Sequence, residues 1–219
     1  KAAHARGRWV GVCGNMAADP VAAPILVGLG VDELSVSIPN VAALKAQMDA
    51  AAGGEVISDR YLAWIAGPLK SWADTAFRTR PGRDDTAIIG SSMGGLMSCY
   101  AFLERPEVFG RAGCVSSHWP AVDPRALAGE DSGVAQMWDA WFAARLGQPD
   151  GRRLWMDHGT ATLDQFYAPY QQVIDARFAA AGWQKGRDWE SRVYDGAEHE
   201  ENAWAARLPE VFGWLLRKD

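Results

Sequence analysis

Short apolar runs alternate with longer segments of helical periodicity along this chain. Six such short runs predict strands over residues 8–13, 33–38, 86–90, 112–116, 153–157 and 189–194. Between them, apolar residues three and four apart predict helices over residues 21–29, 41–52, 58–76, 93–103, 134–146, 166–180 and 203–216. Strands separated by helices of this length pair in parallel. The pattern therefore predicts an α/β fold, with a mostly parallel sheet of about six strands and helices on both faces.

Composition narrows the classes of protein that fit this pattern. The 219 residues suit one domain, and 48% hydrophobic with 22% charged residues excludes disorder of the whole chain. A net charge of −5 argues against a general binder of nucleic acid or anionic membranes. Cys13, Cys99 and Cys114 form no CxxC pair, and we see neither a signal peptide nor an apolar run long enough to span a membrane. We therefore expect a reduced, cytoplasmic setting.

One motif carries candidate chemistry. Gly90-Ser91-Ser92-Met93-Gly94 fits G-x-S-x-G and lies between a predicted strand and a predicted helix. This is the context of a nucleophile elbow, in which a tight turn exposes the serine hydroxyl above the sheet. Ser92 is the expected nucleophile, and the amide of Met93 is the expected first donor to an oxyanion.

A serine hydroxyl needs a base, and the chain has four histidines. His199 follows the last predicted strand and precedes the final helix, where this class of fold places its base. The acid is expected after the preceding strand, where Asp157 and Asp164 are the candidates. We favour Asp164, because a residue at the very end of a strand is used in the turn, and keep Asp157 as the alternative. The order Ser, Asp, His is that of α/β-hydrolases.

Two further histidines, His118 and His158, also follow predicted strands. A three-histidine metal site with His199 is the competing interpretation, but the helical spacing typical of such sites is absent and the serine motif already accounts for His199. We expect no metal and no cofactor. Ser91, His118 and Trp119 are expected to line the substrate pocket.

From about residue 58 to the end, the chain resembles the esterase D-like branch of the α/β-hydrolases, which includes S-formylglutathione hydrolases, feruloyl esterases and enterochelin-type esterases. The stretches that carry the resemblance are TAIIGSSMGGLMSCYAFLERPEVFGRAGCVSSHWP, RLWMDHGTATLDQFY and YDGAEHEENAW. The resemblance implies Ser92 as nucleophile, His199 as base and Asp164 as acid. Family members carry additional residues at the front, including the loop that supplies the second oxyanion donor, and this chain lacks them.

In their place, the segment GVCGNMAADPVAAPILVGLGVDELSVSIPNVAALKAQ is similar to the C-terminal end of enzyme I of the sugar phosphotransferase system. In that family the cysteine matching Cys13 protonates an enolate, and Asn15 replaces the usual acidic residue of the CGEMA motif. The rest of that barrel is missing, so we do not expect phosphotransfer. The chain is interpreted as a chimera joined near residues 47–54.

The two parts are expected to form one structural domain. Residues 1–54 would complete the sheet of the esterase portion, residues 55–219, as a βαβα unit. The loop after the first strand would then lie near Ser92, and an amide of Cys13 or Gly14 would supply the second oxyanion donor. A shortened sheet leaves an edge uncovered, so we expect a homodimer or swapped oligomer.

Taken together, the sequence predicts a serine carboxylesterase that hydrolyses small or short-acyl esters, including aryl esters, through an acyl-enzyme. The alternative is a non-catalytic or barely active chimeric scaffold without a complete oxyanion hole.

Overall fold

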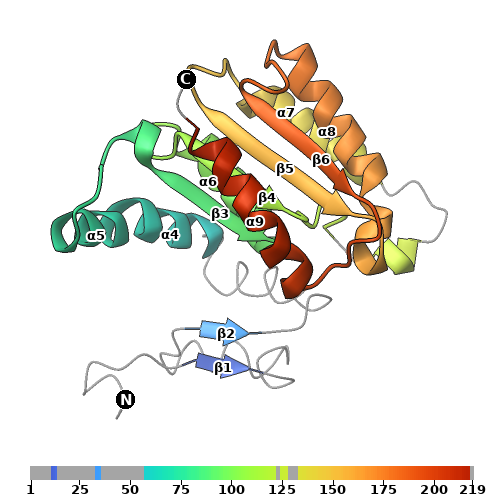
Figure 1. Ribbon diagram of the computed structural model, residues 1–219, viewed down its shortest axis with the longest axis horizontal. Coiled ribbons are helices and arrows are strands. Elements are labelled where there is room, and N and C mark those ends of the chain that lie inside the picture. The colour runs from blue at the N-terminus through green and yellow to red at the C-terminus, as the bar shows by residue number, and fades with distance from the viewer. Residues whose placement is uncertain (1–10, 14–32, 36–56, 122–123, 128–132, 218–219) are drawn as a thin grey trace. The chain divides into compact units, whose positions relative to one another are not determined.

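The computed structural model describes residues 11–13, 33–35, 57–121, 124–127 and 133–217 (Figure 1). The chain divides into two compact units, Lys1–Trp64 and Ile65–Asp219. In the part of the chain that the structure describes, no helix has the length and apolar character needed to cross a membrane.

The first unit contains a short parallel ladder. Strand β1 (Gly11–Cys13) pairs with β2 (Glu33–Ser35), so that Val12 lies beside Leu34. Both strands fall inside the runs where the sequence predicted them. The helices expected over residues 21–29 and 41–52 lie outside the described residues. Helix α4 (Ile57–Trp64) ends this unit.

The long helix expected from residue 58 to 76 is divided into three pieces. Helix α4 is followed in the chain by a π-helical stretch (Ile65–Leu69) and then by α5 (Lys70–Ala76). Pro68 lies inside the π-helical stretch. Because proline has no N–H and its ring crowds the preceding turn, it accounts for the interruption of regular α-helix.

The second unit is built on four parallel strands in the order β3-β4-β5-β6. They are β3 (Ala87–Ser91), β4 (Arg111–Val115), β5 (Arg153–Gly159) and β6 (Trp189–Tyr194). The connections contain helices α6 (Met93–Glu104), α7 (Val134–Arg145) and α8 (Ala168–Ala180), and α9 (Glu201–Leu215) closes the chain. The remaining short segments are 3-10 turns over Arg83–Asp85, Pro124–Leu127 and Thr162–Phe166.

The parallel α/β fold that the sequence predicted is confirmed, with one difference in detail. All six expected strands are present, but the hydrogen-bonded ladders divide them into a pair, β1-β2, and a group of four, β3 to β6. The expectation that the first part of the chain completes the esterase sheet within one domain stays a prediction, as does the oligomeric state.

Helices cover both faces of the four-stranded sheet (Figure 1). Side chains from both faces are buried beneath them, as the alternation along the strands requires. Cys114 of β4 and Met156 of β5 point to the face covered by α6, α7 and α8, where Phe102, Phe142 and Phe178 complete the core. The opposite face is covered by α9. There the packed residues are Val115, Trp155, Val211, Trp214 and Leu215.

Strand β5 extends two residues beyond the predicted end at Asp157. It does so because β6 continues to pair with it: His158 lies beside Val193 and Gly159 beside Tyr194. Asp157 is therefore a residue of the strand interior, paired on one side with β4 and on the other with β6. The predicted end of this strand was therefore wrong, and Asp157 does not lie at the strand end where the sequence placed it.

Candidate active site

Ser92 occupies a strained turn between β3 and α6. Its φ of 56° and ψ of −118° lie in a region that non-glycine residues rarely adopt. The turn is held by hydrogen bonds from the Ser92 amide to the carbonyl of Val115 (2.9 Å) and from the His118 amide to the carbonyl of Ser92 (3.2 Å). A side chain on Gly90 would place its Cβ only 2.5 Å from the carbonyl oxygen of Gly94. The first glycine of the motif is therefore required for the turn.

His199 lies between Ser92 and Asp164. Its Nε2 is 2.9 Å from Oγ of Ser92, and its Nδ1 is 2.5 Å from Oδ1 of Asp164. The amide of His199 donates to Oγ1 of Thr162 at 2.7 Å, which anchors its loop to the turn that carries Asp164. The structure thus brings together the three side chains that the sequence selected, from segments that follow β3, β5 and β6 at one edge of the sheet.

Asp164 is fully buried and its two carboxylate oxygens face different partners. Oδ1 faces His199, while Oδ2 accepts hydrogen bonds from Oγ of Ser116 and from the amide of Gly159, both at 2.6 Å. Burial raises the pKa of this carboxyl group, but the hydrogen bonds from His199, Ser116 and Gly159 outweigh burial and leave the pKa below its ordinary value. Asp164 is therefore ionised at neutral pH.

Asp157, the alternative acid, has a different set of partners. Its Oδ1 accepts the amide of Ser116 at 3.1 Å, its Oδ2 accepts Nε1 of Trp155 at 2.7 Å, and Nη1 of Arg207 lies 3.3 Å from Oδ1. Burial raises the pKa of Asp157, with Arg207 and the two hydrogen bonds opposing that rise. The carboxylate that the structure places against the His199 ring is Asp164.

Three residues next to these side chains were not singled out from the sequence. Ser116 follows β4 at the same edge of the sheet, Tyr167 follows the turn of Asp164, and Arg207 lies on α9. Arg207 had a signal that could have found it: it is three residues after Trp204 and four before Val211, on the buried face of an amphipathic helix. A charged residue at such a position needs a buried partner.

Tyr167 links two histidines. Its hydroxyl lies 2.6 Å from Nδ1 of His118 and 3.5 Å from Nδ1 of His199. Burial, together with the charge of Asp164, raises the pKa of Tyr167 far above its ordinary value, so the phenol keeps its proton. Tyr167 therefore packs beside the His199 ring as a neutral hydrogen-bonding group.

The remaining sequence-selected residues are placed as follows. Ser91 ends β3, and Met93 is the first residue of α6. Trp119 belongs to the core beneath α7, where its Nε1 donates to Gln171 at 2.8 Å. The backbone of Cys13 ends β1, and Gly14 lies outside the described residues. The expected roles of these residues stay predictions.

The metal interpretation joined His118, His158 and His199. The Nδ1 of His158 lies 2.6 Å from the carbonyl of Gly159, and that of His118 faces Tyr167. Among the residues that the structure describes, no group of three or more histidine, cysteine, aspartate or glutamate side chains is arranged to hold a metal ion.

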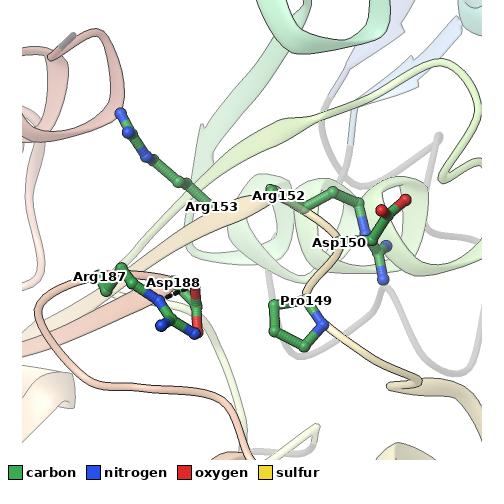
Figure 2. A pocket seen from close by; sticks show the side chains of 7 residues that line it. Pro149, Asp150, Arg152, Arg153, Arg187 and Asp188 are labelled. Atoms are coloured by element: carbon green, nitrogen blue, oxygen red, sulfur yellow. Dashed lines mark hydrogen bonds and ion pairs between the residues drawn. The ribbon is translucent and has the colours of Figure 1, made fainter. Parts of the chain in front are cut away.

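A cavity of about 290 Å³ lies at the other edge of the sheet, before β5 and β6 (Figure 2). The side chains of Arg152 and Arg153 point away from each other there. Arg152 donates to the carbonyl of Phe102 at 3.1 Å, and Arg187 pairs with Asp188 at 2.9 Å. Because these arginine side chains bind other groups of the protein, they do not point together into the cavity to form an anion-binding site.

The site and the parallel sheet together define an α/β-hydrolase-like protein with a serine–histidine–aspartate constellation. A model of the esterase family, whose description reads "Putative esterase", matches residues 13–215. This match extends over most of the chain, and the chain belongs to that family.

Solved structures with a similar fold include two esterases and a serine hydrolase from three bacteria. Ferric enterobactin esterase from Salmonella typhimurium has a TM-score of 0.54 at 19% identity, covering 72% of this chain and 36% of that one. Enterochelin esterase from Shigella flexneri has a TM-score of 0.51 at 17% identity, covering 96% and 52%. The fluorophosphonate-binding serine hydrolase F of Staphylococcus aureus has a TM-score of 0.51 at 15% identity, covering 75% and 65%. These likenesses concern the fold, and this chain spans less than two thirds of each.

A second group of relatives matches a short part of the chain. The multiphosphoryl transfer protein of Rhodobacter capsulatus is 62% identical over 48 residues, which are 22% of this chain and 6% of that protein. The phosphoenolpyruvate-protein phosphotransferase of Bacillus subtilis is 50% identical over 48 residues, which are 8% of its length. The double resemblance predicted from the sequence is confirmed, and with it the chimeric character of the chain.

Proposed function

We propose that the protein is a serine carboxylesterase that hydrolyses small or short-acyl esters, including aryl esters, through an acyl-enzyme. The observation that carries the proposal is the continuous contact from Oγ of Ser92 through His199 to Asp164, with distances of 2.9 and 2.5 Å. Membership of the esterase family supports the same class of reaction, as do the names of the solved relatives, which are a ferric enterobactin esterase, an enterochelin esterase and a serine hydrolase.

In the acylation step, Oγ of Ser92 attacks the ester carbonyl carbon while Nε2 of His199 takes the hydroxyl proton. Asp164 keeps the Nδ1–H of His199 in place and stabilises the imidazolium that forms. The tetrahedral intermediate then collapses, and His199 gives its proton to the departing alcohol or phenol. In deacylation, water attacks the acyl-enzyme, His199 takes a proton from that water, and the acid leaves as Ser92 recovers its own proton.

The negative oxygen of the tetrahedral intermediate needs donors. Met93 is the first residue of α6, and the first N–H groups of a helix have no partner within the helix. Its amide, aided by the positive end of the helix dipole, is the proposed first donor. A second donor from Cys13 or Gly14 remains part of the proposal.

The runner-up is a folded but non-catalytic scaffold. What favours it is that the loop proposed to give the second donor follows β1, in a different unit of the chain from the one that contains Ser92. Loss of one oxyanion donor costs about 10²–10³ in rate, which would leave a barely active protein.

Burst kinetics with p-nitrophenyl acetate separate the two. The esterase proposal predicts a rapid release of about one p-nitrophenol per active site, followed by steady turnover, because acylation precedes slower deacylation. Ser92→Ala is the matched control and should show neither phase. If the unmodified chain, folded by circular dichroism, releases p-nitrophenol no faster than Ser92→Ala, the scaffold interpretation is correct.

A further inference from the structure

Arg207 is a buried cation with few hydrogen bonds. Its side chain is 4% exposed, and its Nε and Nη1 have no hydrogen-bond partner in the described structure. Its Nη2 donates to Oγ of Ser116 at 2.7 Å, and its guanidinium carbon lies 4.9 Å from the centre of the Tyr194 ring. Burying a guanidinium with unmade hydrogen bonds is costly, so the contact with Ser116 needs an explanation.

The hydrogen-bonding capacities of these groups fix the direction of that contact. A guanidinium only donates, so Oγ of Ser116 must accept from Arg207. The single hydroxyl proton of Ser116 is then directed to its other partner, Oδ2 of Asp164, at 2.6 Å. Oδ2 also accepts a hydrogen bond from the Gly159 amide, so both of its lone pairs are used. Oδ1 is left to accept the hydrogen bond from Nδ1–H of His199.

We propose that Arg207 and Ser116 are positioning residues that hold the Asp164 carboxylate in the orientation in which Oδ1 accepts the hydrogen bond from Nδ1–H of His199. The inference rests on the proposed esterase function. It adds a series of buried hydrogen bonds that leads from Arg207 on α9 through Ser116 to Asp164. Both hydrogen bonds run toward the active site: Arg207 donates to Ser116, and Ser116 donates to Asp164.

Asp157 is assigned a place in the same arrangement. Its carboxylate lies 3.3 Å from Nη1 of Arg207 and accepts the amide of Ser116, so it balances the buried cation and fixes the backbone of the residue between them. An unbalanced buried guanidinium would be strongly destabilising. The second acid of the segment is thus the counter-ion of Arg207 rather than the partner of His199.

Other charged and titratable groups surround Asp164. Asp157 and Arg207 face it from β5 and α9 through Ser116, His199 faces it from the loop after β6, and Tyr167 follows it in the chain with its hydroxyl toward His118. Tyr167 keeps its proton because burial raises its pKa, and the Asp157 carboxylate lies 3.3 Å from Nη1 of Arg207.

Ser116→Ala tests the hydroxyl, with Ser117→Ala as the matched control. Ser117 is the next residue, is equally buried, and its Oγ makes no hydrogen bond in the described structure. For Ser116→Ala we expect kcat for p-nitrophenyl acetate to fall about fivefold or more at unchanged KM. The acidic limb of the kcat/KM profile should move to higher pH, because Asp164 with one donor fewer attracts the imidazolium more strongly. Equal pH profiles and kcat for both variants would overturn the proposal, even if Ser116→Ala melts at a lower temperature.

Arg207→Met tests whether the cation acts through Ser116. We expect the acidic limb of its kcat/KM profile to move to higher pH, as in Ser116→Ala. In the double variant Ser116→Ala/Arg207→Met, the fold-loss in kcat should be smaller than the product of the two single fold-losses. Losses that multiply would contradict the proposal. Where Arg207→Met does not fold, Arg207→Lys replaces it. Because lysine keeps a charge and a donor, kcat and the acidic limb should stay close to those of the unmodified protein, and a loss as large as that of Ser116→Ala would contradict the proposal.

The failure of this inference is distinguishable from failure of the esterase proposal. Proton NMR reports the hydrogen of His199 bound to Asp164 as a far-downfield resonance, with no need for turnover. A resonance that moves in Ser116→Ala and stays in Ser117→Ala supports the positioning role even if the chain hydrolyses no ester. A resonance that is unchanged in both variants of an active enzyme overturns the positioning role alone.

Discussion

Gly159, the last residue of β5, lies directly against Ala197 in the loop that carries His199. The amides of Thr160 and Ala161 both donate to the carbonyl of Ala197, at 3.2 and 3.0 Å. A Cβ on Gly159 would lie 2.1 Å from that carbonyl oxygen and 3.1 Å from Oδ2 of Asp164. The distance between Asp164 and His199 therefore depends on the absence of a side chain at this position.

Gly159→Ala is expected to push the His199 loop away from Asp164. A displacement near 1 Å in a reacting group can lower the rate about 10²-fold, so kcat for p-nitrophenyl acetate should fall by at least about tenfold. Gly213→Ala on α9 is the control, because a Cβ there meets nothing within 4 Å. Steady-state kinetics of both purified variants check this, and equal activity in the two would contradict the described loop packing.

The two glycines of the serine motif are expected to differ. Gly90→Ala places a Cβ against the backbone of Gly94, so it should destabilise the fold by about 1–3 kcal/mol. Gly94→Ala meets nothing within 4 Å and lies in α6, so its stability should be unchanged or slightly higher. Urea unfolding followed by circular dichroism measures both. The reverse order of stability would show that the turn is built differently.

The pH dependence of stability should carry a contribution from Asp164. Its pKa in the folded state is lowered, so the unfolded chain binds the proton more readily. The stabilisation is present above the unfolded pKa of about 3.9 and is lost as the pH falls through the folded value. Asp164→Asn should therefore flatten the fall in unfolding free energy between about pH 5 and 2. Urea unfolding at a series of pH values tests this, and an unaltered slope would speak against an ionised Asp164.

Removal of the Asp157 charge is expected to leave Arg207 without its counter-ion. Breaking a buried pair from one side costs about 3–5 kcal/mol, so Asp157→Asn should lower the unfolding free energy by that order. Asp150→Asn is the comparison: it breaks an exposed pair with Arg83, and exposed pairs contribute little. If chemical denaturation finds the two variants equally stable, Asp157 is not the partner on which Arg207 depends.

The sequence was sufficient to select the three side chains that the structure brings together, because each follows a strand of recognisable pattern. Parallel strands place their carboxyl ends at one edge, so Ser92, Asp164 and His199 could be expected to meet. The choice of Asp164 over Asp157 followed from distance along the chain after the strand. The structure adds a reason that this argument did not contain, since β5 continues past Asp157.

The residues behind the site could not be predicted in the same way. Ser116 and Arg207 are 91 residues apart and their contact depends on how α9 lies over the sheet. Helix periodicity places Arg207 on the buried face, but the partner of a buried charge is decided by packing across elements. The place of strand β1 is a further case. The local sequence pattern predicts a strand there, but it does not say which sheet that strand joins.

Reaction with a fluorophosphonate, followed by mass spectrometry of the digested protein, tests the central claim most directly. The account predicts one adduct per chain, on the peptide that contains Ser92, and no adduct in Ser92→Ala. It also predicts that labelling slows strongly in His199→Ala, because the serine hydroxyl then has no base. A folded chain that takes up no label, or takes it up on another residue at the same rate in Ser92→Ala, would contradict the account.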